Sequence, residues 1–164
     1  MPLQPQLTGP GDILTWEISD ALPQGLTFDS NTGEISGIPT ELWPTTNYTV
    51  WANNSGGSVE IEFNITVVDE MPTLAYSPDD LDLTNNTASA DLPLVPQITG
   101  SGEILTWELN NTNLPSGILF ASNNGTFYGT PTELWPTTAY KVWANNTGGT
   151  VEAYLNITVV DEVP

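Results

Sequence analysis

The chain carries nearly the same stretch of sequence twice, and this repetition limits its possible folds more than any other feature. Residues 7–70 and 98–162 align end to end with one single-residue insertion, and 41 of the 64 aligned pairs are identical. A repeat of this length is sufficient for a small domain with its own core. We therefore predict two domains, residues 1–70 and residues 71–164, rather than one fold of 164 residues.

The residue pattern within each repeat predicts β-strands. No segment keeps the apolar spacing of a helix, and 14 prolines and 14 glycines interrupt the chain. Apolar and polar residues alternate over 59–67 and again over 151–159. Trp16 alternates in phase with Leu14 and Ile18, which places it in the core. Segments 29–33 and 53–57, rich in Asn, Ser and Gly, are typical of hairpin turns. Short strands separated by such turns predict a β-sandwich.

Two motifs in the repeats resemble a known family. The first is LPQGLTFD at residues 22–29 followed by TGEISGIPT at 32–40, with a matching version at 114–132. The second is the Tyr-x-Val-x-Ala strand that begins at Tyr48 and at Tyr140. Both are similar to the immunoglobulin-like repeats, close to dystroglycan-type cadherin-like domains, of bacterial and archaeal surface proteins. The resemblance implies an all-β fold of two tandem immunoglobulin-like or cadherin-like β-sandwich domains, which in that family mostly serve as extracellular spacers.

The composition excludes several classes of partner. Twenty acidic residues face one cation, Lys141, and no Arg or His, so the formal net charge is −19. Such a surface repels nucleic acid and anionic lipid. No apolar run approaches the roughly 18 residues that a membrane span needs, so we expect no membrane insertion in this segment. The richness in Thr and Asn is typical of secreted β-proteins, which favours an extracellular or cell-surface location.

The sequence also argues against catalysis. Without His and Cys, the commonest general base and two common metal ligands are missing. Carboxylate pairs can hydrolyse glycosides, but the repeated acids, such as Glu17 with Glu108 and Glu41 with Glu133, occur in two copies on a thin sandwich. We therefore expect a protein that is not an enzyme and requires no cofactor.

Calcium is the one ion that the sequence favours. Ca²⁺ is bound by hard oxygen ligands, and a domain boundary can gather them. Acidic residues follow the predicted last strand of each repeat, and more acidic residues follow the junction between the two repeats. The simpler alternative is that they are solvated loop residues. The candidate calcium ligands are Asp69, Glu70, Asp79, Asp80, Asp82, Asp161 and Glu162.

Two further groups of residues are candidates for contact with sugars. Trp43 and Trp51 recur as Trp135 and Trp143. Exposed indoles can stack on glycans or on other subunits, although local packing is the simpler explanation. Eight Asn-x-Ser/Thr sequences are possible glycosylation sites. They begin at Asn47, Asn53, Asn64, Asn85, Asn110, Asn124, Asn145 and Asn156.

The two repeats differ at their beginnings. Residues 71–97 contain strand-like segments around Leu74 and Leu81, whereas the first repeat has only residues 1–6 in the equivalent place. Either the chain boundary falls one strand late, or the strand comes from another molecule or is supplied out of sequence order. The leading hypothesis is a non-catalytic repeat of a cell-surface stalk, adhesin or filament that contacts neighbouring repeats or copies of itself. Alternatives are a filament subunit completed by strand donation and a carbohydrate-binding module that uses the exposed tryptophans.

Overall fold

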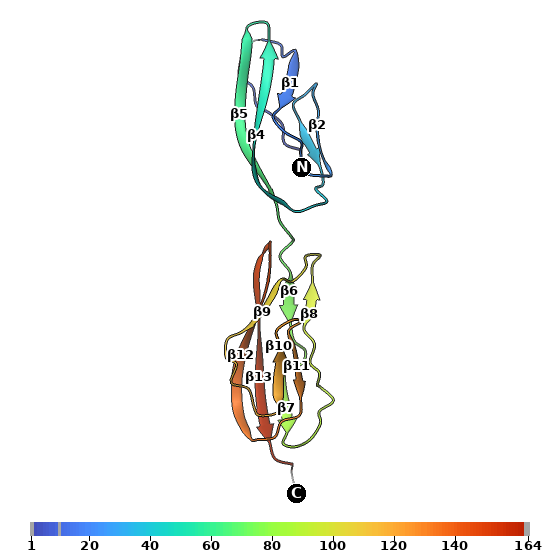
Figure 1. Ribbon diagram of the computed structural model, residues 1–164, viewed down its shortest axis with the longest axis vertical. Helices are drawn as coiled ribbons and strands as arrows, with labels where there is room; N and C mark the ends of the chain where they lie inside the picture. Colours follow the sequence, from blue (N-terminus) through green and yellow to red (C-terminus); the bar gives the residue numbers. More distant parts are fainter. Residues whose placement is uncertain (1, 10, 163–164) are drawn as a thin grey trace. The chain divides into compact units, whose positions relative to one another are not determined.

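The computed structural model describes residues 2–9 and 11–162, and their regular structure is entirely β (Figure 1). The all-β prediction is confirmed. No helix in this part of the chain is long and apolar enough to cross a membrane. The chain forms two compact units, Met1–Val68 (unit 1) and Asp69–Pro164 (unit 2). Their boundary falls two residues before the predicted one, because Asp69 and Glu70 hydrogen-bond to Thr147 and Asn146 of unit 2.

Unit 2 is a β-sandwich whose larger sheet has the strand order β7-β13-β12-β9. The strands of this sheet are β7 (Asp80–Thr84), β13 (Gly149–Val160), β12 (Trp135–Asn146) and β9 (Thr106–Leu109). The remaining strands form two pairs, β10 (Ile118–Ala121) with β11 (Thr126–Gly129) and β6 (Thr73–Ala75) with β8 (Gln97–Thr99). β7 runs parallel to β13, whereas the other pairs are antiparallel.

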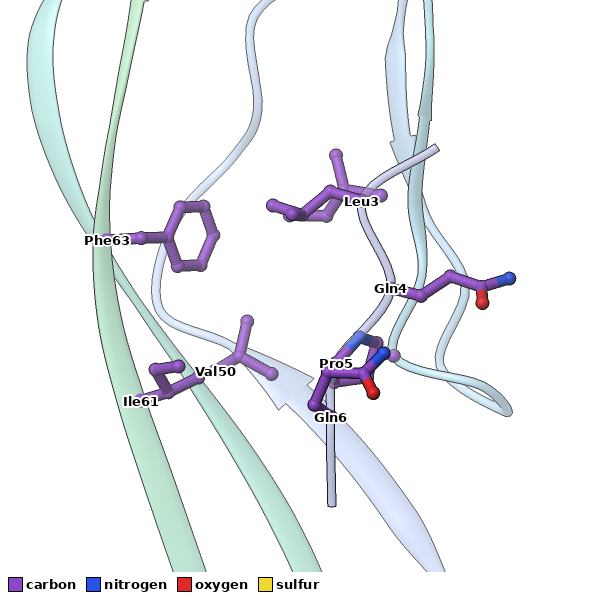
Figure 2. A pocket seen from close by; sticks show the side chains of 9 residues that line it. Leu3, Gln4, Pro5, Gln6, Val50, Ile61 and Phe63 are labelled. Carbon is purple, nitrogen blue, oxygen red and sulfur yellow. The ribbon is translucent and has the colours of Figure 1, made fainter. Parts of the chain in front are cut away.

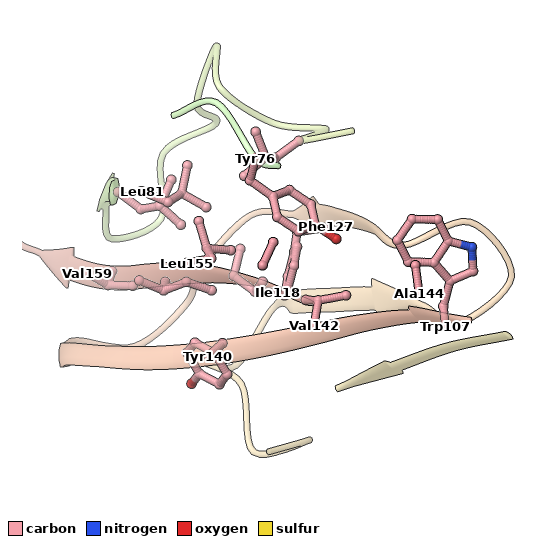
Figure 3. Close-up of a cluster of buried hydrophobic side chains, with 14 residues drawn as sticks. Tyr76, Leu81, Trp107, Ile118, Phe127, Tyr140, Val142, Ala144, Leu155 and Val159 are labelled. Atoms are coloured by element: carbon pink, nitrogen blue, oxygen red, sulfur yellow. The ribbon is translucent and has the colours of Figure 1, made fainter. Parts of the chain in front are cut away.

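The core of unit 2 follows from the alternation along β13. Leu155, Ile157 and Val159 are almost completely buried. In the neighbouring strand β7, Leu81 and Leu83 are 0% and 1% exposed. All five belong to one buried cluster with Phe127, and Figure 3 shows Leu81, Leu155 and Val159 among its side chains. Complete burial of an aliphatic side chain contributes about 1.5–3 kcal/mol, so β7 is an integral part of this core.

Unit 1 repeats the same plan with fewer strands. Its larger sheet has the order β1-β4-β5, made of β1 (Thr15–Ile18), β4 (Trp43–Asn54) and β5 (Gly57–Val67). The smaller sheet of unit 1 is the pair β2 (Leu26–Phe28) and β3 (Ile35–Gly37). Two backbone hydrogen bonds join Leu3 to Ile35 of this pair. Residues 2–9 and 11–68 contain no counterpart of β7, so β5 is an edge strand.

Most local predictions hold, with one error. Both predicted turns are present: β4 and β5 are joined through Ser55 and Gly56, and the Asp29 carbonyl accepts the Gly33 amide. Trp16 is buried as predicted, at 8% exposed. The prediction that Leu14 shares the core with it is wrong. Leu14 is 71% exposed because it precedes β1, and its counterpart Leu105 before β9 is exposed to a similar degree.

Candidate binding surfaces

The open edge of unit 1 is the largest difference between the two units. Ile61 and Val59 of β5 are 60% and 59% exposed, while Ala153, the counterpart of Ile61, is 7% exposed. Phe63 is half-buried, whereas its counterpart Leu155 is 1% exposed. The two strands have the same alternation, but in unit 2 the strands β6 and β7 both contact β13, and unit 1 has no counterpart of either among its described residues.

An apolar cavity of about 230 Å³ opens beside this edge. Figure 2 shows Leu3, Phe63, Val50 and Ile61 around it. Gly33, in the turn between β2 and β3, and Ile35 of β3 also line it, together with residues 4–6 of the amino-terminal segment. This cavity was not foreseen from the sequence, although the unequal beginnings of the two repeats already indicated uncovered core.

In unit 2 the corresponding space is filled by Tyr76. Its ring contacts the Phe127 ring edge-on, with 5.6 Å between centroids, and its hydroxyl donates to the carbonyl oxygen of Gly125. Phe127 and Gly125 are the counterparts of Ile35 and Gly33 in the repeat alignment. Burial raises the pKa of Tyr76. Tyr76 therefore shows which kind of side chain fits the cavity of unit 1.

The outer face of the larger sheet carries Trp51 in unit 1 and Trp143 in unit 2. The Trp51 indole donates to a carboxylate oxygen of Glu60 at 2.7 Å, and Trp143 makes the equivalent bond to Glu152 at 3.3 Å. Trp51 alternates with the buried Val50 and Ala52, which places it on the face opposite the core. Both indole nitrogens are occupied by an acid directly across the strand pair.

Unit 2 adds a cation to this outer face. The Lys141 ammonium lies 2.7 Å from Glu152 and 4.9 Å from the centroid of Tyr154. The hydrogen bond between Lys141 and Glu152 raises the pKa of Lys141 and lowers the pKa of Glu152. Unit 1 has Thr49 and Glu62 in place of Lys141 and Tyr154, so the outer faces of the two units differ in chemistry.

Trp43 and Trp135 occupy a different environment from the outer tryptophans. Both are half-buried, and Trp135 packs against the core of unit 2. Their indole nitrogens are buried and have no hydrogen-bond partner among the described residues. Stacking of sugars on any of the four tryptophans stays a prediction.

The acids predicted to bind calcium are spread along unit 2. Asp69 lies at the β12–β13 hairpin, where its carboxylate accepts the Thr147 hydroxyl. Asp80 accepts the Asn156 side-chain amide farther along β13, and Asp161, beyond the end of β13, accepts the Asn85 amide. Glu70, Asp79, Asp82 and Glu162 are exposed. In residues 2–9 and 11–162 no group of three or more His, Cys, Asp or Glu side chains could hold a metal ion.

Calcium binding therefore stays a prediction of the sequence, and a thermal melt tests it. A ligand that binds only the folded state raises the melting temperature. If these acids hold calcium, the midpoint of unit 2 rises between chelator and excess Ca²⁺, and Asp69→Asn reduces that rise. Magnesium at the same ionic strength is the control, because general screening of the acidic surface affects both ions alike.

The eight possible glycosylation sites fall into two groups. The side-chain amides of Asn53, Asn85, Asn145 and Asn156 donate hydrogen bonds to neighbouring side chains. Asn47, Asn64, Asn110 and Asn124 are exposed. Glycosylation stays a prediction at all eight positions, and the exposed group offers the more accessible amides.

The repeated acids that were considered for catalysis have structural partners instead. Glu41 and Glu133 each accept a backbone amide, from Gln24 and Ser116 respectively, at 2.8 Å. Glu17 and Glu108 accept the side-chain amides of Asn53 and Asn145. Their occurrence in both repeats is therefore explained by hydrogen bonds that hold the same loop and strand pair in each unit.

Comparison with known proteins agrees with this architecture. A family model described as "Putative Ig domain" matches residues 1–68 and again residues 72–160. The chain therefore belongs to this immunoglobulin-like family, as two tandem members. The predicted family resemblance is confirmed.

Among proteins of known name, the chain is similar to the "Serine-rich adhesin for platelets" of Staphylococcus aureus. The two are 34% identical over 119 residues, which cover 71% of this chain and 5% of the adhesin. The same adhesin from strain MRSA252 matches with equal identity and is covered to 8%. The chain thus spans less than a tenth of the length of these relatives.

Solved structures of immunoglobulin domains are also similar. The four N-terminal domains of Dscam1 isoform 4.44 match with a TM-score of 0.45 and 15% identity, over 89% of this chain and 37% of that one. The titin I-band fragment I67–I69 matches with a TM-score of 0.43 and 17% identity, over 98% of this chain and 59% of the fragment.

Proposed function

We propose that this chain is a non-catalytic, extracellular segment of a cell-surface stalk or adhesin, in which each immunoglobulin-like unit acts as a structural module. The observation that carries the proposal is the tandem pair of family members that resembles a small part of a much longer adhesin. Immunoglobulin-like repeats of this kind are typically non-enzymatic. The acids repeated in both units have structural partners, which supports the same conclusion.

The surface chemistry supports a role outside the cell. A net charge of −19 on 164 residues repels nucleic acid and anionic lipid and keeps the chain soluble at high density on a surface. The partners that we propose are neighbouring repeats, other copies of the chain and, through Trp51 and Trp143, glycans. The outer face of unit 2 is the better candidate for a glycan, because Trp143, Lys141 and Tyr154 place aromatic and charged groups together.

A glycan and matrix-protein array separates a purely structural role from an adhesive one. The unchanged full chain is compared with Trp143→Ala and with Leu105→Ala. Leu105 is an exposed apolar residue just before β9 and serves as the control. An adhesive role predicts saturable binding to a defined sugar or protein that Trp143→Ala weakens about tenfold or more, as loss of an aromatic anchor does. A structural module binds nothing saturably. Hydrolysis of an array sugar would contradict the proposal as a whole.

A second candidate function, completion of unit 1 by a donated strand, is favoured by the exposed edge of β5 and by the cavity beside it. It concerns assembly rather than adhesion, and the two are compatible in one protein.

A further inference from the structure

We infer that the open edge of unit 1 binds one kind of extended segment: an aromatic residue followed by leucines five and seven positions later, as in residues 76–83. The segment comes from another repeat of this family. It would add to β5 as a parallel strand and place its aromatic ring in the cavity of unit 1. This inference names the ligand of the strand-donation candidate, and it stands whether or not the chain is also adhesive.

The acceptor strand carries the first part of the argument. Residues 64–68, which cover the end of β5 and the residue after it, have the same sequence as residues 156–160 of β13, Asn-Ile-Thr-Val-Val. β7 pairs in parallel with that sequence over all five positions in unit 2. The edge of β5 therefore offers the residues that already bind such a strand elsewhere in the same chain, and extended peptides commonly add to exposed sheet edges in this way.

The polar contacts of β7 define the expected register. The backbone amide of Asn156 donates to the carbonyl oxygen of Asp79 at 2.8 Å, and the Asn156 side-chain amide donates to the Asp80 carboxylate at 2.7 Å. At the other end, the Asn85 amide donates to the Val160 carbonyl at 2.8 Å. Asn64 and Val68 are the counterparts of Asn156 and Val160 in unit 1. The donated segment is expected to make the same three bonds there.

The apolar contacts define the side chains. Tyr76 fills the space bounded by Gly125 and Phe127 in unit 2, and the corresponding space in unit 1 is the cavity of about 230 Å³ beside Gly33 and Ile35. Leu81 and Leu83 lie opposite Ile157 and Val159, whose counterparts are Ile65 and Val67. A segment with this spacing would therefore cover the half-buried side of β5 as well as its edge.

The source of the segment follows from the burial of β7. Leu81 and Leu83 are 0% and 1% exposed in unit 2. A second copy of this chain could lend its own β7 only by opening an identical edge in its unit 2, so such an exchange buries no additional surface. A further repeat of the family, with a strand not already used, is the donor that yields a net gain. The segment is acidic and the chain is strongly acidic, so binding is expected to strengthen as salt screens their repulsion.

The test uses the full, unglycosylated chain and a fluorescent peptide with the sequence of residues 76–87. We expect saturable binding of one peptide per chain, tighter at about 1 M salt than at about 0.1 M, with new hydrogen-exchange protection at residues 64–68. The matched peptide carries aspartate in place of both leucines and should bind at least about tenfold more weakly. Protection confined to unit 2 would mean that the peptide only exchanges with β7 and would overturn the inference, as would the absence of saturable binding.

A protein variant tests the register without disturbing the core. Asn64 is exposed, so Asn64→Ala should leave the melting curve unchanged while it weakens peptide binding several-fold, because one hydrogen bond to the incoming acid is lost. Asn47→Ala, also exposed but on β4, is the control and should bind as the parent does. A dimer in which residues 64–68 are already protected without peptide would show that two β5 edges pair directly, and the inference would then be wrong.

Discussion

Leu81→Ala is expected to lower the free energy of unfolding of unit 2 by about 3 kcal/mol, within the range of large-to-small substitutions in cores. Leu81 is 0% exposed and lies opposite Ile157 in the parallel pair of β7 and β13. The loss combines the transfer free energy of the side chain with the cavity that remains, because the surrounding strands are fixed by their ladders and relax only partly.

Urea unfolding followed by hydrogen exchange measures this effect for each unit separately. The unfolding of unit 1 should be unchanged, since β7 belongs to unit 2. Leu105→Ala is the matched control: Leu105 is 60% exposed, and its truncation should change the stability by no more than about 0.5 kcal/mol. Equal, small effects of the two substitutions would show that β7 is not part of the stable core of unit 2.

Gly129→Ala is expected to destabilise unit 2 by more than about 3 kcal/mol, since backbone strain and steric overlap add at one position. Gly129 has φ of +119°, and a Cβ there would lie 2.0 Å from the carbonyl oxygen of Gly117. That oxygen belongs to the backbone beside the paired strand β10, so it cannot move away as the end of a flexible side chain could. The same close approach occurs between Gly37 and Gly25 in unit 1.

Gly57→Ala separates the effect of backbone strain from the effect of steric overlap. Gly57 also has a positive φ, +139°, but a Cβ at this position would meet nothing within 4 Å. Only the conformational strain remains, which costs about 1–2 kcal/mol. Thermal unfolding of both variants gives the comparison. If Gly57→Ala proved as damaging to unit 1 as Gly129→Ala is to unit 2, the close approach to Gly117 would not be the reason for the larger effect.

Much of the fold could be predicted because the relevant signals are local. The alternation along residues 59–67 and 151–159 determines which side chains share a face, and the Asn- and Gly-rich segments mark the turns between strands. The same alternation cannot tell whether a face is covered. Ile61 and Ala153 occupy matching positions, yet only Ala153, in the unit where β6 and β7 contact the corresponding strand, is buried.

The candidate sites were harder to predict, for related reasons. The contact between Tyr76 and Gly125 joins residues 49 positions apart, and nothing in the local sequence around Tyr76 specifies it. Trp43 and Trp51 have similar exposure, but one indole nitrogen is buried without a described partner and the other is bound to Glu60. Such differences depend on tertiary neighbours, whereas a linear pattern reports only periodicity and charge.

The parallel pairing of β7 with β13 also determines how unit 2 would respond to force. A pull that enters before β7 and leaves after Val160 draws two parallel strands in opposite directions, so their five paired positions share the load and must break nearly together. In the described part of unit 1, residues 2–9 and 11–68, the Leu3–Ile35 bridge is the pairing near the amino end, with hydrogen bonds of 2.9 and 3.0 Å. Unit 1 would yield at lower tension than unit 2. Two modules with mostly identical sequences would thus extend in separate steps, the first absorbing small strains before the second begins to open.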